Sequence, residues 1–319
     1  MSASLIHAGS RRLRRWLAVG LPMLFVAVLG GNVAATAAGG EGTVFRTIDV
    51  PGAAATGLNC VNNRGTLLGT WFDSNGGSYG FIEQPGGQPT TFNYPGTTGV
   101  TNSGCINDLG IAVGGYYDTT TNVGHGWVRW PSGNFTPIDY PLSGVQGTFV
   151  TGINDRGLIV GNYTDESGEV HGFIDNHGTF TTLDFPGAAF TSNSAVNNSG
   201  TMIGGYSDTF DVIHGPGVIH GFLYEHGKFT TIDAPGAGTA QGQGTYEEGI
   251  SSNGTIGGFT VNDNGASGWL LRMGQFSSLN YPNAAPGQSY VTGISSSARH
   301  ASGDYTDASG GHGFVATLN

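Results

Sequence analysis

The sequence predicts an all-β fold: a six-bladed β-propeller of repeats of about 45 residues, closed into a ring when its first strand joins its last blade. Three observations predict it. One phrase recurs six times at nearly constant spacing. Each copy contains short alternating runs of apolar and polar residues, separated by Gly, Pro, Asn and Asp, which is typical of strands and turns. The array also begins and ends on different strand types.

The repeat is clearest at 181–229, where T-T-L-D-F-P-G-A is followed by a spacer, V-N-N-S-G-T-M-I-G-G-Y-S-D, and later H-G-F. The first phrase carries an aspartate or asparagine, which falls at Asp49, Asn93, Asp139, Asp184, Asp233 and Asn280. The intervals between these positions are 44, 46, 45, 49 and 47 residues. A period of this size indicates a solenoid, a propeller or an array of small units.

Each copy is expected to form four short strands. In the third copy the first is the run at 135–140, which alternates with period two and is closed by the turn residues that follow it. The second ends at Ile153 and Asn154, where N-D-R-G forms a turn. The third covers 158–163, and the fourth carries H-G-F at 171–173. No segment after the N-terminal region has apolar periodicity of 3.6, so almost no helix is expected.

The two ends of the array favour a ring over an open stack. The array begins with a lone first-type strand at 45–49 and ends just after a fourth-type strand at 312–315. If the fourth strand of each copy pairs with the following first strand, the lone strand completes the last blade. Closure removes exposed sheet edges, whereas an open array needs polar capping repeats, and the sequence shows none.

These motifs resemble the HAF family of extracellular repeats. The matching segments are I-N-D-R-G-L-I-V-G at 153–161 and H-G-F at 171–173, and the resemblance covers 45–315. The chain has Gly where the family has the middle Ala of His-Ala-Phe, and its links read D-x-P-G-A. The resemblance implies an exported repeat protein and carries no catalytic residues to transfer.

The N-terminal region has the three parts of a secretory signal peptide. Four arginines precede an apolar run at 16–31, and Ala35, Thr36 and Ala37 fit a cleavage site. The alternative is an uncleaved anchor, but the run is shorter than the roughly 20 residues that span a bilayer. We therefore predict a signal peptide at 1–37, a linker at 38–44, the propeller at 45–319, and a periplasmic or extracellular location.

The charge of the mature chain restricts its partners. Cleavage removes four of the eleven basic residues and none of the 22 acidic ones, which gives 7 − 22 = −15. Such a surface repels phosphate backbones, so we expect no nucleic-acid binding, and it disfavours anionic membrane surfaces. No second apolar run is long enough for a membrane span. A soluble monomer that binds a protein or a glycan fits this balance.

Four copies carry a histidine in the H-G-F/W phrase, and each has an aspartate upstream. We expect a charge-assisted hydrogen bond across the hairpin in each; the pairs are Asp118–His125, Asp165–His171, Asp208–His220 and Asp307–His312. The other two copies have Tyr79 and Ser267, and the aspartate aligns with Asp73 in one and Val261 in the other. The alternative is a ring of imidazoles that binds metal or moves protons, but a propeller would hold them far apart.

The longest loop, 208–218, lies in copy four and is expected to contact a ligand. Two adjacent carboxylates in copy five suggest acid/base chemistry on glycosidic bonds, but neighbours on a strand face opposite sides. The residues proposed for ligand contact are Asp208, Asp211, His214, His220, Glu247 and Glu248. No catalytic residue, cofactor or metal is assigned. Calcium remains a minor alternative, because one aspartate per turn gives too few oxygen ligands.

Two further sets occupy equivalent positions in different copies. Cys60 and Cys105 either form a disulfide in an exported protein or stay as two buried thiols. The recurring aromatic position is expected to form core between blades rather than a platform for sugars; its members are Trp71, Tyr116, Tyr163, Tyr206, Phe259 and Tyr305. The favoured function is an exported binding module for a protein or glycan. The alternatives are an exported carbohydrate-active enzyme, a hydrolase or lyase, and a structural cell-surface protein.

Overall fold

A computed structural model describes residues 36–38 and 42–318. The predicted signal peptide lies outside these residues except for Thr36 and Ala37, which belong to strand β1 (Thr36–Ala38). The described residues form strands and turns with no α-helix, which confirms the all-β prediction. Within the described ranges, no helix has the length and apolar character needed to cross a bilayer.

Five successive groups of four antiparallel strands, here called units one to five, make up most of the chain. Unit one holds β3 (Ala55–Val61), β4 (Leu67–Phe72), β5 (Ser78–Glu83) and β6 (Thr90–Phe92). Unit two holds β7 (Thr101–Ile106), β8 (Ala112–Asp118), β9 (Val123–Arg129) and β10 (Phe135–Ile138). Unit three holds β11 (Gly147–Ile153), β12 (Leu158–Thr164), β13 (Val170–Asn176) and β14 (Thr179–Thr182).

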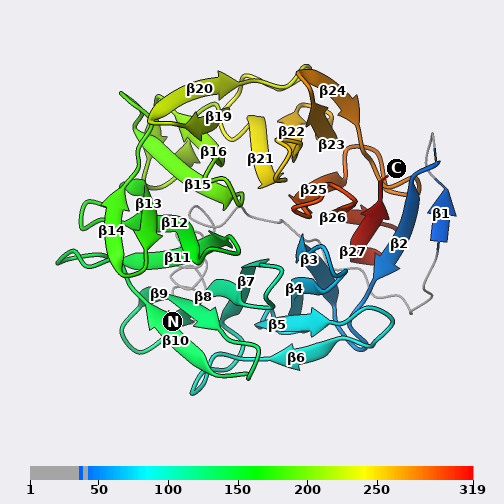
Figure 1. The fold of residues 1–319 in the computed structure, drawn as a ribbon, viewed down its shortest axis with the longest axis horizontal. Coiled ribbons are helices and arrows are strands. Elements are labelled where there is room, and N and C mark those ends of the chain that lie inside the picture. The colour runs from blue at the N-terminus through cyan, green and yellow to red at the C-terminus, as the bar shows by residue number, and fades with distance from the viewer. Residues whose placement is uncertain (1–35, 39–41, 319) are drawn as a thin grey trace, which may run out of the picture.

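Unit four holds β15 (Phe190–Val196), β16 (Met202–Ser207), β19 (His220–Glu225) and β20 (Lys228–Ile232), with the small hairpin β17 (Phe210–Asp211) and β18 (Gly215–Pro216) inserted in it. Unit five holds β21 (Gly244–Ile250), β22 (Ile256–Asn262), β23 (Gly265–Arg272) and β24 (Gln275–Ser278). Figure 1 shows the units following one another around a common centre, with the first strand of each unit innermost.

Unit six draws its strands from both ends of the described chain. It holds β25 (Ser289–Ile294), β26 (His300–Asp307) and β27 (Gly310–Thr317), which pair in that order. Its fourth strand is β2 (Val44–Ile48), which pairs antiparallel with β27, from Val44 opposite Thr317 to Ile48 opposite Gly313. Strand β1 pairs with the outer edge of β2. The lone first-type strand of the sequence therefore lies beside the last fourth-type strand (Figure 1).

The turns after the inner strands contact one another around the centre. In unit three, Asn154 Oδ1 accepts hydrogen bonds from Arg156 N and Leu158 N, and Gly157 has φ of 79°, so N-D-R-G closes a tight turn. Asparagine side chains also donate to the next unit's turn: Asn62 to Asn107 O at 2.9 Å, Asn107 to Asn154 O at 3.0 Å, Asn154 to Asn197 O at 2.9 Å and Asn197 to Ser251 O at 3.1 Å.

Two more contacts continue this series from unit five to unit one. Ser252 N donates to Ser296 O at 2.8 Å, and Ser297 N donates to Asn63 Oδ1 at 2.7 Å. The six contacts therefore run through the units in order and return to the first. We call them the turn belt.

The core lies between neighbouring sheets. The aromatic residue of each H-G-F-type phrase is buried, at Phe81, Trp127, Phe173, Phe222, Trp269 and Phe314. Its ring covers a glycine of the preceding strand in the same unit. A Cβ on Gly161, for example, would lie 2.8 Å from the Phe173 ring. Glycine is required there because no side chain fits beneath the ring.

Candidate functional site

The histidines and their partners lie at the end of each sheet that faces away from the turn belt. Antiparallel order places the turn between second and third strands at this end, together with the D-x-P crossover into the next unit. We call this end the crossover face. It collects the polar side chains that the sequence analysis singled out in units two, three, four and six.

Each histidine uses Nδ1 to contact the aspartate that follows its own unit's outer strand. The distances are 2.9 Å for His125–Asp139, 2.8 Å for His171–Asp184, 3.0 Å for His220–Asp233 and 2.8 Å for His312–Asp49. These partners at Nδ1 were not predicted, but two of the predicted pairs, Asp165–His171 and Asp307–His312, are also present, at Nε2. A signal for the Nδ1 partners exists in the sequence, because the two copies that lack the histidine, with Tyr79 and Ser267, are followed by Asn93 and Asn280 instead of an aspartate.

The predicted upstream aspartates lie at the turns, and two of the four contact their histidines. Asp165 lies 3.5 Å and Asp307 3.3 Å from Nε2 of their histidines, as second contacts. Asp118 accepts a hydrogen bond from Thr120 N in its own turn. In the part of the chain that the structure describes, no hydrogen bond or ion pair joins Asp118 to His125 or Asp208 to His220.

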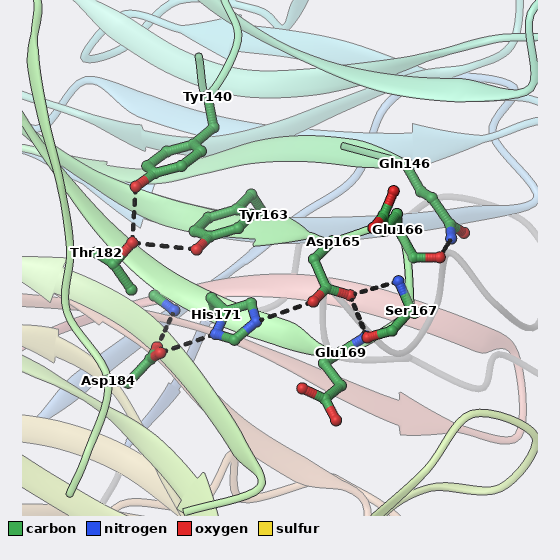
Figure 2. A network of polar contacts seen from close by, with 11 residues as sticks. Tyr140, Gln146, Tyr163, Asp165, Glu166, Ser167, Glu169, His171, Thr182 and Asp184 are labelled. Atoms are coloured by element: carbon green, nitrogen blue, oxygen red, sulfur yellow. Dashed lines mark hydrogen bonds and ion pairs between the residues drawn. The ribbon is translucent and has the colours of Figure 1, made fainter. Parts of the chain in front are cut away.

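The recurring aromatic residues stack on neighbouring rings; four of the six are buried, and Trp71 and Tyr116 are half-buried. In unit three, Tyr163 stacks on Tyr140 of the incoming crossover at 3.9 Å and 5°, and on His171 at 5.0 Å. Thr182 Oγ1 is hydrogen-bonded to both tyrosine hydroxyls, at 2.7 and 3.1 Å (Figure 2). Tyr163 is only 5% exposed. The stack therefore fixes the crossover to the sheet and leaves no open ring for a sugar.

Unit five departs from this pattern, and its register differs from that predicted. Thr260, not Phe259, lies opposite Ser267 and takes the aromatic position. Phe259 instead stacks on Tyr246 of its own inner strand at 4.8 Å. The residue equivalent to the turn aspartate is consequently Asn262, not Val261; its Oδ1 accepts a hydrogen bond from Asn264 N at 2.8 Å.

The most complete polar cluster surrounds His171 in unit three (Figure 2). Asp165 Oδ1 accepts hydrogen bonds from Ser167 N at 2.9 Å, Ser167 Oγ at 2.7 Å and Glu169 N at 2.9 Å. Burial opposes the charge on the imidazole, but the hydrogen bond and charge of Asp184, with those of Asp165, outweigh it and raise the pKa of His171. Asp165, Glu169 and His171 each offer one ligand atom within 4.8 Å of the others.

The long loop of copy four, residues 208–218, lies beside this cluster. We call it the unit-four loop. Asp211 Oδ1 accepts hydrogen bonds from Ile213 N and His214 N, and lies 2.9 Å from His214 Nδ1. Val212 packs on the unit-three turn, since a Cβ on Gly168 would lie 3.2 Å from Val212 Cγ1. Ile213 at the tip is 77% exposed.

Glu247 and Glu248 lie away from the loop and face different surroundings. Glu247 is 1% exposed, packs against Gly221, and has no hydrogen-bond partner on either oxygen. Burial raises its pKa well above the ordinary value. Glu248 lines a cavity between the inner strands, of about 60 Å³; burial and the charge of Asp304 raise its pKa to about 8. The residues predicted for ligand contact therefore do not form one site: Asp208, Asp211 and His214 share the unit-four loop, His220 contacts Asp233, and Glu247 and Glu248 lie on β21.

Cys60 and Cys105 line the same cavity. They lie on the inner strands of units one and two, with Cα atoms 5.0 Å apart, and a disulfide joins them. The position is occupied by Gly152, Ala195, Gly249 and Gly293 in the other units, so only small residues meet near the centre.

The sequence matches no family model, and a search of curated proteins finds no match. Solved structures do resemble the chain. A gluconolactonase of Xanthomonas campestris is 12% identical, with TM-score 0.52, over 93% of this chain and 100% of that one. The sialidase of Trypanosoma rangeli is 11% identical, with TM-score 0.51, over 92% of this chain and 59% of that one.

The fungal lectin of Aleuria aurantia, described as a six-bladed β-propeller that recognises fucose, is 10% identical, with TM-score 0.48, over 82% of this chain and 91% of that one. Likeness at such identities concerns the fold alone. The chain is an all-β protein similar to β-propellers.

Proposed function

We propose that the chain is an exported six-bladed propeller, closed by β2, that binds a protein partner through the unit-four loop. Pairing of β2 with β27 and the turn belt support six blades in a closed ring. Four arginines before an apolar run, and a disulfide between Cys60 and Cys105, support export.

The exposed apolar tip of the unit-four loop carries the binding proposal. Ile213 and Val212 are 77% and 43% exposed, on a surface otherwise rich in polar residues. The base of the loop is fixed, because Phe210 stacks on Phe190 at 5.8 Å and Val212 rests on Gly168. A loop held in one conformation loses less entropy on binding. The exposed carboxylate of Asp211 lies beside the tip, so a partner with an apolar recess and a basic group at its rim fits it.

The cavity between the inner strands favours surface binding over catalysis there. Its volume of about 60 Å³ is space for a few water molecules, whereas small-molecule sites are roughly 300–1,000 Å³. The aromatic stack of unit three is closed to solvent and offers no platform for a glycan. A protein partner therefore suits the geometry better than a sugar.

The test compares two exposed apolar residues at different ends of the sheets. Ile213→Asp changes the loop tip, and Met273→Asp changes a fully exposed residue in the β23–β24 turn. We expect wild type and Met273→Asp, as residues 38–319, to capture the same partner from extracellular or periplasmic extract. Ile213→Asp should capture at least tenfold less of this partner. Equal capture by all three variants would overturn the proposal, and binding on a glycan array unaffected by Ile213→Asp would move it to a glycan.

A second candidate, a carbohydrate-active enzyme, is favoured by one observation. Glu248 lines the cavity with a pKa of about 8, in the range where a carboxyl group serves as a general acid at neutral pH. The similar folds of a gluconolactonase and a sialidase suggest lactones and glycosides as substrates to assay. Activity lost in Glu248→Gln and kept in Ile213→Asp would favour this candidate.

A further inference from the structure

The orientation of His171 leaves one ring nitrogen available beside two carboxylates. Nδ1 lies 2.8 Å from Asp184 Oδ2, and Asp184 Oδ1 accepts a hydrogen bond from Gly172 N at 3.0 Å. Asp184 thus orients the ring and favours a proton on Nδ1. Nε2 then faces Asp165. A carboxylate behind the imidazole in this way is the usual support of a metal-binding histidine.

The oxygen atoms of Asp165 are divided between two tasks. Oδ1 receives all three donors of the turn, from Ser167 and Glu169. Oδ2 lies 3.5 Å from His171 Nε2, longer than a good hydrogen bond. Two ligands at about 2.0–2.2 Å from a tetrahedral ion are separated by about 3.4 Å. The observed separation therefore suits one ion shared by the two atoms.

Glu169 supplies a third ligand atom within 4.8 Å of the other two. Its side chain is exposed, so a rotation about its bonds brings the carboxylate closer at little cost. In the described structure, the carboxylate of Glu169 forms no hydrogen bond or ion pair with another side chain. It stands free beside Asp165 and His171, as Figure 2 shows.

Unit six provides an internal comparison, because it repeats the same arrangement without the third ligand. His312 Nδ1 contacts Asp49, and Nε2 lies 3.3 Å from Asp307. There, however, Ser309 Oγ is hydrogen-bonded to Nε2 at 2.9 Å, and Gly310, opposite Asp307, takes the place of Glu169. Both serines donate to the aspartate of their own turn, Ser167 to Asp165 and Ser309 to Asp307, but only Ser309 also reaches the histidine. The histidine Nε2 is therefore hydrogen-bonded to a serine in unit six, whereas its contact in unit three is the 3.5 Å approach of Asp165 Oδ2.

We propose that Asp165, Glu169 and His171 bind one divalent transition-metal ion, with Asp184 orienting the histidine. One imidazole nitrogen and two carboxylate oxygens are ligands that Zn²⁺ accepts, and a water molecule completes a tetrahedral set. The site lies beside the unit-four loop, which rests on Gly168 of the same turn. It is separate from the apolar tip on which the proposed function rests.

The test is titration of residues 38–319 with Zn²⁺ by calorimetry, and with Co²⁺ by absorption. We expect one ion per chain. Glu169→Gln and His171→Gln should weaken binding at least tenfold, and Asp184→Asn about tenfold. Asparagine occurs naturally at the last position in two other copies, so this variant should fold.

His312→Gln and His214→Gln are the controls, since both histidines also lie beside an aspartate. Binding should be unchanged in both. Addition of Zn²⁺ should shift the NMR signals of the His171 ring and not those of His312. Unchanged affinity in Glu169→Gln, or loss of binding in either control, would overturn the assignment of the site.

Discussion

Glu247 places a buried carboxyl group at a repeat position that an asparagine occupies in unit four. The equivalent residue in unit four, Asn193, packs on Gly172 and donates its amide to Phe173 O at 3.2 Å. Glu247 packs on Gly221 in the same way. A protonated carboxyl group can donate a hydrogen bond as an amide does, and burial raises the pKa of Glu247 toward that neutral form. The buried carboxyl group is therefore more fully protonated in the folded state than in the unfolded chain.

The effect of a raised carboxyl pKa on stability can be measured at Glu248. Its pKa is about 8 in the folded chain and about 4.3 when unfolded. Between these values the folded state holds the extra proton, so the free energy of unfolding falls as the pH rises from about 4 to 8. We expect Glu248→Gln to flatten the slope by up to about 1.4 kcal/mol per pH unit, the contribution of one proton.

Urea denaturation at several pH values measures the slope. Glu166→Gln is the matched control, because that side chain is exposed on the crossover face, and it should leave the slope as in wild type. An identical slope in Glu248→Gln and wild type would mean that Glu248 is already ionised in the folded protein.

At the scale of the element, each crossover is fixed by a hydroxyl of the next inner strand. An Asp or Asn follows the outer strand of every unit, and the backbone N–H of the next residue donates to this hydroxyl at 2.9–3.0 Å. The acceptors are Thr56, Thr101, Thr148, Thr191, Thr245 and Ser289. The crossover is irregular backbone, and without this acceptor its N–H would lack a partner. The hydroxyl that recurs in all six units therefore holds the start of each crossover against the inner strand that follows it.

Thr148 offers a test of the crossover hydroxyl, since it is buried and accepts from Tyr140 N at 3.0 Å. Thr148→Val keeps the shape and removes the acceptor, so we expect a loss of about 1–3 kcal/mol in the free energy of unfolding. Thr148→Ser restores the acceptor, as Ser289 does in unit six, and should recover most of the loss in denaturant titrations. Equal losses in both variants would assign the effect to packing.

Strand positions followed from the sequence more readily than side-chain partners did. The run predicted at 158–163 is β12 (Leu158–Thr164), because alternation and turn residues are local signals. The partner of each histidine was not local, since it lies on the outer strand and, for His312, 263 residues away. The register of Phe259 was misplaced by one position, because the Gly257-Gly258 pair leaves the alignment of copy five ambiguous. The proposed metal site could not be predicted from a sequence motif, because it depends on how the turn before β13 brings Asp165, Glu169 and His171 together.

At the scale of the molecule, several contacts tie β2 to units six and one. Thr47 Oγ1 is hydrogen-bonded to Tyr281 and Tyr305, at 2.8 and 3.0 Å. Asp49 contacts His312 at 2.8 Å. Arg46 pairs with the buried Glu83 of unit one at 2.8 Å. Side-chain contacts between such distant parts of the sequence offset the entropy of joining the two ends. The N-terminal strand should therefore matter more for stability than its length suggests.

A circular permutant tests whether β2 belongs to unit six. The new chain begins at Val50, runs to Thr317, continues through a His-Gly turn, and ends with residues 44–49. Unit three uses this two-residue turn between Asn176 and Thr179, where β13 meets β14, and Val44 lies opposite Thr317 in the same relation. Within the six units, the chain is opened between Asp49 and Val50, at the start of a crossover.

We expect the permutant to melt within a few degrees of residues 38–319, because the pairing of β2 with β27 is retained. A chain of residues 50–318 without β2 leaves Glu83 buried without Arg46, His312 without Asp49, and β27 as an open edge. Removing one partner of a fully buried ion pair lowers the free energy of unfolding by about 3–5 kcal/mol. The loss of Arg46 beside Glu83 should cost less, because Arg46 is partly exposed. That chain should melt far lower or aggregate. If it melts with the permutant, β2 does not close the ring, and the fold is stable as an open array.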